Sequence, residues 1–312
     1  MNGSPGAAGP FSGITSDRKK ALIGMAAALA VTLIWSIWLV VSRAAALSPL
    51  TPFDLAAIRY GVSGIVALPI VLAYQPWRGM ALLRIITITL LLGPLYVLLA
   101  FGGFHFAPAA HGGIFMNGAL PLITLAIAWL WLRQKPTGRQ ITASLIILTG
   151  VAMTVGDTTF DFAETWRGDA LFVLAAVSFC FYVTLARLWE VTVPQVLMCS
   201  AVLNGIIYVP IWYFLLPSGF AEVSQSQFWL QFLFQGFAPN LFGLLMVAIA
   251  ARNIGPSSTA AVMSGVPALV AFMSMIFLAE PVGPASWAGI IVLTAGILIM
   301  TRRGRVPVAP IA

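Results

Sequence analysis

Ten long apolar segments decide what this chain can fold into. They fall near residues 21–42, 53–74, 82–104, 109–132, 140–156, 169–187, 195–216, 228–251, 257–279 and 284–301. An α-helix rises ~1.5 Å per residue, so about 20 residues cross ~30 Å of hydrocarbon. Hydrophobic residues make up 60% of the chain and charged residues 8%. We therefore predict an all-α integral membrane protein of ten transmembrane helices, with no soluble domain among its 312 residues.

Basic residues predict how these segments are oriented. Of the 16 Lys and Arg residues, 13 fall before the first segment, in the even-numbered connections or after the last segment. Basic connections usually stay on the cytoplasmic side. We therefore expect both ends of the chain in the cytoplasm. The net charge of +7 does not indicate nucleic-acid binding, because the basic residues flank apolar segments and form no basic domain.

Prolines reveal an internal duplication. When the two halves are aligned at offsets of 141 to 148 residues, six prolines of the first half match six of the second. The pairs are Pro52 and Pro194, Pro69 and Pro210, Pro94 and Pro239, Pro108 and Pro256, Pro121 and Pro267, and Pro136 and Pro281. Arg43 likewise aligns with Arg187. Such agreement indicates two copies of one structural unit.

Each copy holds five segments, an odd number, so the second copy enters the membrane in the opposite sense. Two inverted five-helix repeats are a common plan for transporters. The expected organisation has a flexible N-terminal tail (1–17), a first repeat (18–161), a second repeat (162–305) and a C-terminal tail (306–312).

Four of the matched prolines lie well inside segments 3, 4, 8 and 9: Pro94, Pro121, Pro239 and Pro267. Proline lacks an N–H group and clashes with the preceding turn, so we expect segments 3, 4, 8 and 9 to bend. On a purely structural interpretation these prolines have no role in transport, because membrane helices generally tolerate proline. Two matched pairs favour the alternative, in which these prolines act as hinges during transport.

Polar and aromatic side chains indicate where a solute could bind. Five polar side chains are expected near the bilayer midplane, namely Tyr96, Asn117, Asn204, Asn240 and Ser264. They either bond helices together or face a wet cavity. Asn117 and Asn240 lie within about a turn of matched prolines, which favours the cavity, whereas Asn204 is more typical of a bond between helices.

Aromatic residues also match between the halves, although most aromatics in a membrane protein pack helices or face lipid. Trp35 aligns with Phe179, and Trp38 with Tyr182, both at an offset of 144 residues. An aromatic pair on the first helix of each repeat would suit a flat, partly apolar solute. The candidate substrate-binding residues are therefore Trp35, Trp38, Tyr96, His111, Asn117, Phe179, Tyr182, Asn240 and Ser264.

Titratable side chains are scarce in the segments. His105 and His111, the only histidines, have no Cys or carboxylate close in sequence, so no metal site and no cofactor are expected. His111 either contacts the substrate or an external gate, or is a solvated interfacial histidine. Arg59 is assigned a structural role, snorkelling outward or meeting Asp54 or a carbonyl.

No Asp or Glu is expected in the middle of any segment, and no acid is expected beside either histidine. Proton-coupled carriers commonly use a buried carboxylate. This favours facilitative movement of substrate down its gradient, with weak coupling through histidine as the alternative. The two cysteines, Cys180 and Cys199, lie in apolar runs and are expected to be packing residues.

The chain resembles the drug/metabolite transporter superfamily, and specifically its EamA-type bacterial members. The resemblance covers about residues 20–302 and rests on “TLIWSIWLVVSRAA”, “PFDLAAIRYGVSG”, “GGFHFAPAAHGGIFMNGALPLITLAIAWLWLRQKP” and “IGPSSTAAVMSGVPALVAFMSMIFLAEP”. It implies ten helices in two inverted repeats, with helices 1, 3, 4, 6, 8 and 9 around a central cavity, helices 2 and 7 outside, and helices 5 and 10 as supports. It also implies a bacterial inner-membrane exporter of small metabolites.

Among its branches the chain looks most like the YddG-type aromatic amino-acid exporters. Phosphate-carrying branches need cationic side chains at the cavity, and no Lys or Arg is expected at the midplane. The expected function is export of small metabolites by alternating access, as a facilitative uniporter that is a monomer or weak homodimer in the lipid bilayer. The expected substrates are aromatic or other neutral amino acids, and drugs are a further possibility. The alternatives are a proton-linked multidrug or metabolite exporter and, more remotely, a channel or a membrane-embedded enzyme. An enzyme would need a nucleophile and base or a metal set, and no HExxH or GxSxG motif is present.

Overall fold

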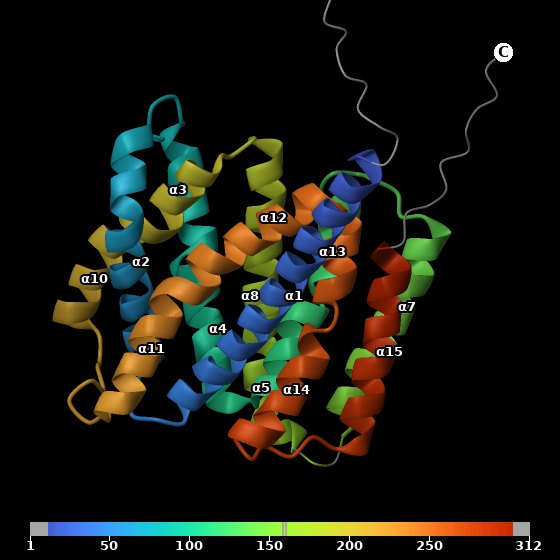
Figure 1. The fold of residues 1–312 in the computed structure, drawn as a ribbon. Coiled ribbons are helices and arrows are strands. Elements are labelled where there is room, and N and C mark those ends of the chain that lie inside the picture. Colours follow the sequence, from blue (N-terminus) through green and yellow to red (C-terminus); the bar gives the residue numbers. More distant parts are fainter. Residues whose placement is uncertain (1–11, 158, 160, 302–312) are drawn as a thin grey trace, which may run out of the picture.

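The computed structural model describes residues 12–157, 159 and 161–301, which form helices joined by short connections (Figure 1). Ten stretches of these residues are long and apolar enough to cross a membrane. No strand occurs in this part of the chain. The predicted all-α fold with ten spans is therefore confirmed. Large apolar side chains such as Leu83, Phe214 and Phe277 are exposed on its outside, as a surface in contact with lipid requires.

Five spans are single helices: α1 (Ser12–Ala46), α2 (Pro52–Tyr74), α7 (Gly138–Val155), α8 (Phe162–Leu188) and α15 (Pro284–Thr301). Helix α1 thus begins inside the segment 1–17 that composition predicts as a tail, whereas its membrane-spanning part begins at Arg18. Residues 1–11 and the predicted C-terminal tail lie outside the described residues.

The other five spans are interrupted. Span 3 is α3 (Leu82–Leu92) and α4 (Pro94–Phe106), and span 9 is α13 (Pro256–Met263) and α14 (Val266–Phe277). The remaining three contain a wider π-helical turn. They are span 4, built of α5 (Ala109–His111), η1 (Gly112–Gly118) and α6 (Leu120–Leu130); span 7, built of α9 (Val193–Leu197), η2 (Met198–Leu203) and α10 (Asn204–Leu215); and span 8, built of α11 (Gln225–Phe237), η3 (Ala238–Gly243) and α12 (Leu244–Ile254).

Prolines account for most of these interruptions. Pro94 begins α4 directly after the break at Gly93, and Pro239 lies within η3. Pro121 and Pro267 are in the first turn of α6 and α14, each just after the irregular part of its span. Because proline cannot donate the backbone hydrogen bond, the helix ends or widens before it. The hinge role of these four prolines stays a prediction.

Contacts between spans follow the predicted two-fold relation of the repeats. Span 1 packs on span 8 through α1 and α12, and the corresponding spans 6 and 3 pack through α8 and α4. Spans 2 and 7, 4 and 9, and 5 and 10 each pack on their own counterparts. Pairing of this kind is what two inverted five-helix repeats produce about an axis in the membrane plane. Figure 1 shows α7 and α15, the final span of each repeat, side by side at one edge.

Local sequence explains two details of this arrangement. Thr51 and Asp54 form a capping box at the start of α2, and Thr192 and Gln195, both 141 residues later, stand at the start of span 7. In spans 5 and 10, a Cβ added at Gly150 would lie 2.5 Å from the carbonyl oxygen of Gly289, and the reverse distance is also 2.5 Å. Glycine at both positions therefore lets the two backbones touch.

Candidate functional site

A central cavity lies between the two repeats, lined by side chains from spans 1, 2, 3, 4, 6, 7 and 8. Its free volume is about 50 Å³, which is room for a few water molecules. In this conformation the lining side chains are close together, and a solute with an aromatic ring could enter only if they moved apart. The resemblance places spans 2 and 7 outside the cavity, which is wrong here, because Arg59 and Ser200 line it.

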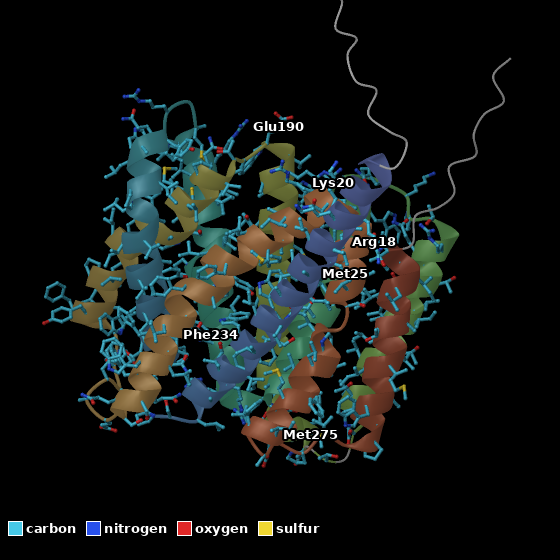
Figure 2. All side chains as sticks on the ribbon, viewed as in Figure 1. Arg18, Lys20, Met25, Glu190, Phe234 and Met275 are labelled. Carbon is cyan, nitrogen blue, oxygen red and sulfur yellow. The ribbon has the colours of Figure 1, made fainter. Side chains whose placement is uncertain are left out.

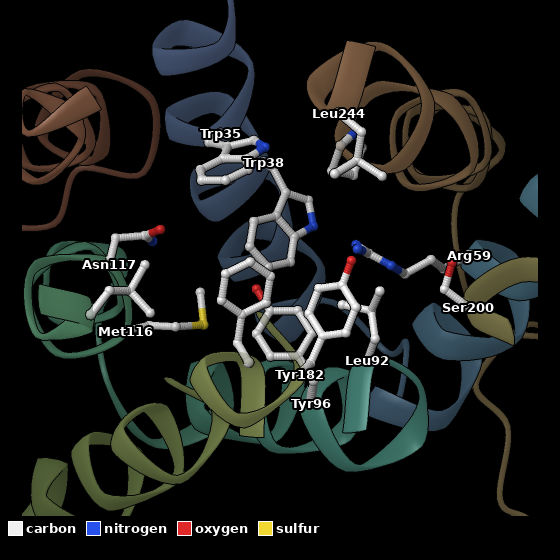
Figure 3. A pocket seen from close by; sticks show the side chains of 13 residues that line it. Trp35, Trp38, Arg59, Leu92, Tyr96, Met116, Asn117, Tyr182, Ser200 and Leu244 are labelled. Atoms are coloured by element: carbon white, nitrogen blue, oxygen red, sulfur yellow. The ribbon is translucent and has the colours of Figure 1, made fainter. Parts of the chain in front are cut away.

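Aromatic rings form one side of this cavity (Figure 3). The ring centroids of Trp38 and Tyr96 are 6.4 Å apart, those of Tyr96 and Phe179 are 5.4 Å apart, and those of Phe179 and Tyr182 are 5.7 Å apart. Trp35 lines the same cavity one turn before Trp38. The repeat-matched aromatics of α1 and α8 therefore meet in one place, in contact through Tyr96 of α4.

Trp38 is held in position by polar side chains of α11. Its indole Nε1 donates a hydrogen bond of 2.8 Å to Oε1 of Gln235. The amide nitrogen of Gln235 donates to Ser42 and to Gln231, whose own amide nitrogen donates to the carbonyl oxygen of Val41. Both glutamines are fully buried. This network fixes the ring plane of Trp38 and joins span 8 to span 1.

Asn117 lies in the π-helical turn η1 and lines the central cavity. Its amide nitrogen is buried and has no hydrogen-bond partner. A buried amide donor without a partner costs free energy, so a solute that accepts a hydrogen bond there would gain that energy back. Asn204, by contrast, donates from Nδ2 to the carbonyl oxygen of Thr89 in α3, as expected for a bond between helices.

Arg59 is the only charged residue among the described residues that line this cavity. Its guanidinium carbon is 5.3 Å from the centroid of the Trp38 ring, and Figure 3 shows it pointing toward the rings. Asp54, its expected partner, instead bonds with Thr51, Trp212 and Gly219. The prediction that no Lys or Arg reaches the centre is therefore wrong. Hydropathy placed Arg59 in span 2 but does not show which way its side chain faces.

A second cavity of about 270 Å³ continues from the first, and both share Trp35, Asn117 and Leu120 as lining residues. Ser264 lines this second cavity, as do Ala251, Pro256 and Thr301 near the ends of α12, α13 and α15. Those ends lie on the same face of the bundle as the start of α1 (Figure 1). The centre is thus connected toward the face that carries the start of span 1 and the end of span 10.

The opposite face is closed by an ion pair and hydrogen bonds between the spans. Nε of Arg43, at the end of α1, is 2.6 Å from Oε1 of Glu280, just after α14. The other carboxylate oxygen of Glu280 accepts a 2.9 Å hydrogen bond from the backbone of Ala109, and Arg43 also donates to the carbonyl oxygen of Phe104. These bonds tie spans 1, 3, 4 and 9 together at one point.

His111 belongs to this closed face and not to the cavity wall. Its Nδ1 lies 2.8 Å from Oδ1 of Asp169 in α8, and both side chains are buried. The expectation that neither histidine has an acidic neighbour is wrong, because the 58 residues that separate the two in sequence hid the contact. Among the described residues, no group of three His, Cys, Asp or Glu side chains could hold a metal ion.

The structure brings six of the nine predicted binding residues into the central cavity: Trp35, Trp38, Tyr96, Asn117, Phe179 and Tyr182. Ser264 lines the adjoining cavity and His111 lies at the closed face. The side chain of Asn240 lies outside the part of the structure that is described. Sequence reasoning did not identify Ser200, Met116 or Arg59 as lining residues, and only Arg59 carried a signal, as a charge inside an apolar segment. Substrate binding by these residues stays a prediction.

Comparison with known proteins agrees with this architecture. Residues 22–156 and 166–302 each match the EamA-like transporter family, so each repeat is one copy of that domain. No curated protein matches the chain in sequence. A solved structure titled “Crystal structure of protein” is similar in fold, with a TM-score of 0.60, 20% identity, and coverage of 90% of this chain and 96% of that one.

Proposed function

We propose that this chain, which belongs to the EamA-like transporter family, exports small aromatic metabolites across the bacterial inner membrane by alternating access. Membership makes it a multi-pass membrane transporter. Aromatic amino acids are the substrates that we favour, in line with the resemblance to YddG-type exporters. The start of span 1 and the end of span 10 would face the cytoplasm, because Lys and Arg are in excess there. Figure 2 shows Arg18 and Lys20 at that end of the bundle.

One observation supports the substrate class above all others. Aromatic rings from both repeats and from α4 gather in a single cavity, and one of them, Trp38, is held in place by a hydrogen-bond network. Offset or edge-to-face contacts with a flat ring are worth about 0.5–1.5 kcal/mol each beyond area burial. Several such contacts favour an aromatic solute over an aliphatic one of similar size.

Facilitative transport remains our first candidate for the mechanism. No Asp or Glu occurs among the described residues that line either cavity, so the pathway itself offers no carboxylate that could carry a proton across. Proton-linked export is a second candidate, favoured by the buried pair of His111 and Asp169. That pair joins span 4 of one repeat to span 6 of the other, where a change of protonation could bias the closed face.

Uptake of radiolabelled phenylalanine, tryptophan and leucine into proteoliposomes tests both points. We expect saturable uptake of the two aromatic amino acids, little uptake of leucine, and no dependence on an imposed pH gradient. Tyr182→Ala should reduce aromatic uptake, whereas Tyr213→Ala, which removes a ring that is 72% exposed on the outside, should not. Equal uptake of leucine would refute the aromatic preference. A pH-driven flux that Asp169→Asn abolishes would favour the second candidate.

A further inference from the structure

We propose that Arg59 is the anion-binding group of the central cavity, and that the cavity takes aromatic monocarboxylates in preference to neutral or cationic analogues of the same size. This inference rests on the proposed function, because it assumes that the cavity is the transport site. It goes further by naming the charge that the substrate carries and the residue that binds it.

The position of Arg59 is the first reason. The residue lies in the middle of the fold, is 5% exposed, and lines the cavity together with the aromatic rings. Its guanidinium stacks over Trp38, whose own orientation is fixed by Gln235. A guanidinium whose position is set by stacking loses little freedom when it forms two parallel hydrogen bonds with a carboxylate.

The charge balance of the cavity is the second reason. Arg59 is the single charged residue among the described lining residues, and none of them is acidic. A guanidinium that lines a cavity of low dielectric attracts an anionic solute more strongly than one in water does.

The surrounding groups narrow the class of ligand. The rings of Trp38, Tyr96 and Tyr182 suit a flat apolar body, and the amide of Asn117 can donate one hydrogen bond from the side opposite Arg59 (Figure 3). One guanidinium balances one negative charge, so a monocarboxylate fits better than a phosphate dianion. An ammonium group finds no carboxylate among the described residues of this wall. The expected order of preference is therefore aromatic acid, then aromatic amino acid, then aromatic amine.

Four probes that share one phenyl ring test this order in proteoliposomes: 3-phenylpropionate, phenylalanine, 3-phenylpropionamide and 2-phenylethylamine. We expect the acid to be taken up best. Because the acid carries net charge, an inside-negative potential set with potassium and valinomycin should lower its uptake and leave phenylalanine uptake unchanged. Arg59→Gln should weaken binding of the acid, measured by its competition for uptake, on the order of 10- to 100-fold. Binding of the amide should weaken far less. Arg59→Lys should retain part of the preference.

Arg84→Gln is the matched control. Arg84 also stacks on a tryptophan, with its guanidinium carbon 5.5 Å from the Trp189 ring, but it is exposed at the start of α3. Its replacement should leave the ratio of acid to amide uptake unchanged. Size-exclusion chromatography and thermal unfolding of each variant, with and without 3-phenylpropionate, separate loss of binding from loss of folding.

The outcomes distinguish this inference from the proposed function. If folded wild-type protein transports the amide as well as the acid, or if folded Arg59→Gln loses both equally, Arg59 only braces Trp38 and the inference is wrong. If wild-type protein neither binds nor transports any of the four probes, the proposed function fails, and this inference fails with it.

Discussion

The two faces of the bundle differ although they are built from the same repeated unit. At the closed face, Arg43 pairs with Glu280. The aligned positions on the other face are Arg187, at an offset of 144, and Lys135, at an offset of 145. Both are cationic and exposed. The repeat therefore preserves one partner of the pair and reverses the charge of the other.

The second pair of the closed face differs in the same way. His111 and Asp169 align with Thr259 and Met25, at offsets of 148 and 144, so neither aligned position holds a titratable group. The fold is therefore symmetric, whereas the bonds that close one of its faces are not. A conformation closed on the other face would have to be held without these two pairs of polar side chains, which favours the conformation seen in Figure 1.

Removal of Glu280 should have the largest effect on this difference. Glu280→Ala leaves Arg43 without its acidic partner and the N–H group of Ala109 without its acceptor. Breaking a largely buried pair costs about 3–5 kcal/mol, which corresponds to more than 100-fold in the equilibrium between closed and open face. A cysteine at Ala110, in a background without Cys180 and Cys199, should then react much faster with a membrane-impermeant maleimide. An unchanged rate would mean that the pair does not hold the face closed.

Replacement of Asp157, in the connection between α7 and α8, should have the next largest effect, in this case on the free energy of unfolding. It accepts hydrogen bonds from Thr159 and from the backbone of Ser286 near the start of α15. Burial alone would raise its pKa, but these hydrogen bonds outweigh burial and lower the pKa from 3.8 to about 2. Because the folded pKa is below the unfolded one, the stabilisation is present above about pH 4 and disappears as the pH falls toward 2.

Asp157→Asn should accordingly lower the free energy of unfolding by about 2 kcal/mol at pH 7. The difference between variant and wild type should narrow below pH 4. Thermal unfolding of the detergent-solubilised protein measures both, with Asp161→Asn as a control, because Asp161 is exposed and only caps α8. A difference that stays constant down to pH 2 would contradict the assigned hydrogen bonds.

Lys135→Glu supplies the acid that the open face lacks. Of the three replacements it should have the smallest effect. The new carboxylate would stand at the position that aligns with Glu280 and could pair with Arg187 when that face closes. An exposed pair is worth about 1 kcal/mol or less, so we expect at most about a tenfold shift toward closure. Slower maleimide labelling of Ala260→Cys in the second cavity measures it. Arg133→Glu, in the same connection, should change the rate little.

Sequence was sufficient for the ten spans and for the repeat, because both depend on periodic features that lie along the chain. The matched aromatics of α1 and α8 were also found, since each sits on the first helix of its repeat. Arg59 was placed in the right span but on the wrong side, because apolar residues surround it in sequence and its orientation depends on packing between spans 1, 2 and 3. The contact of His111 with Asp169 required the tertiary structure, and alignment with Met25 gave no hint of it.

The glycine contact between spans 5 and 10 has a practical consequence. At Gly150 and Gly289 the backbones of these two helices touch directly, and no side chain between them at that point could be compressed or rearranged. Spectroscopic labels attached to the outer sides of α7 and α15 should keep a constant separation throughout the transport cycle. That pair therefore offers an internal standard against which the displacement of every other span can be measured.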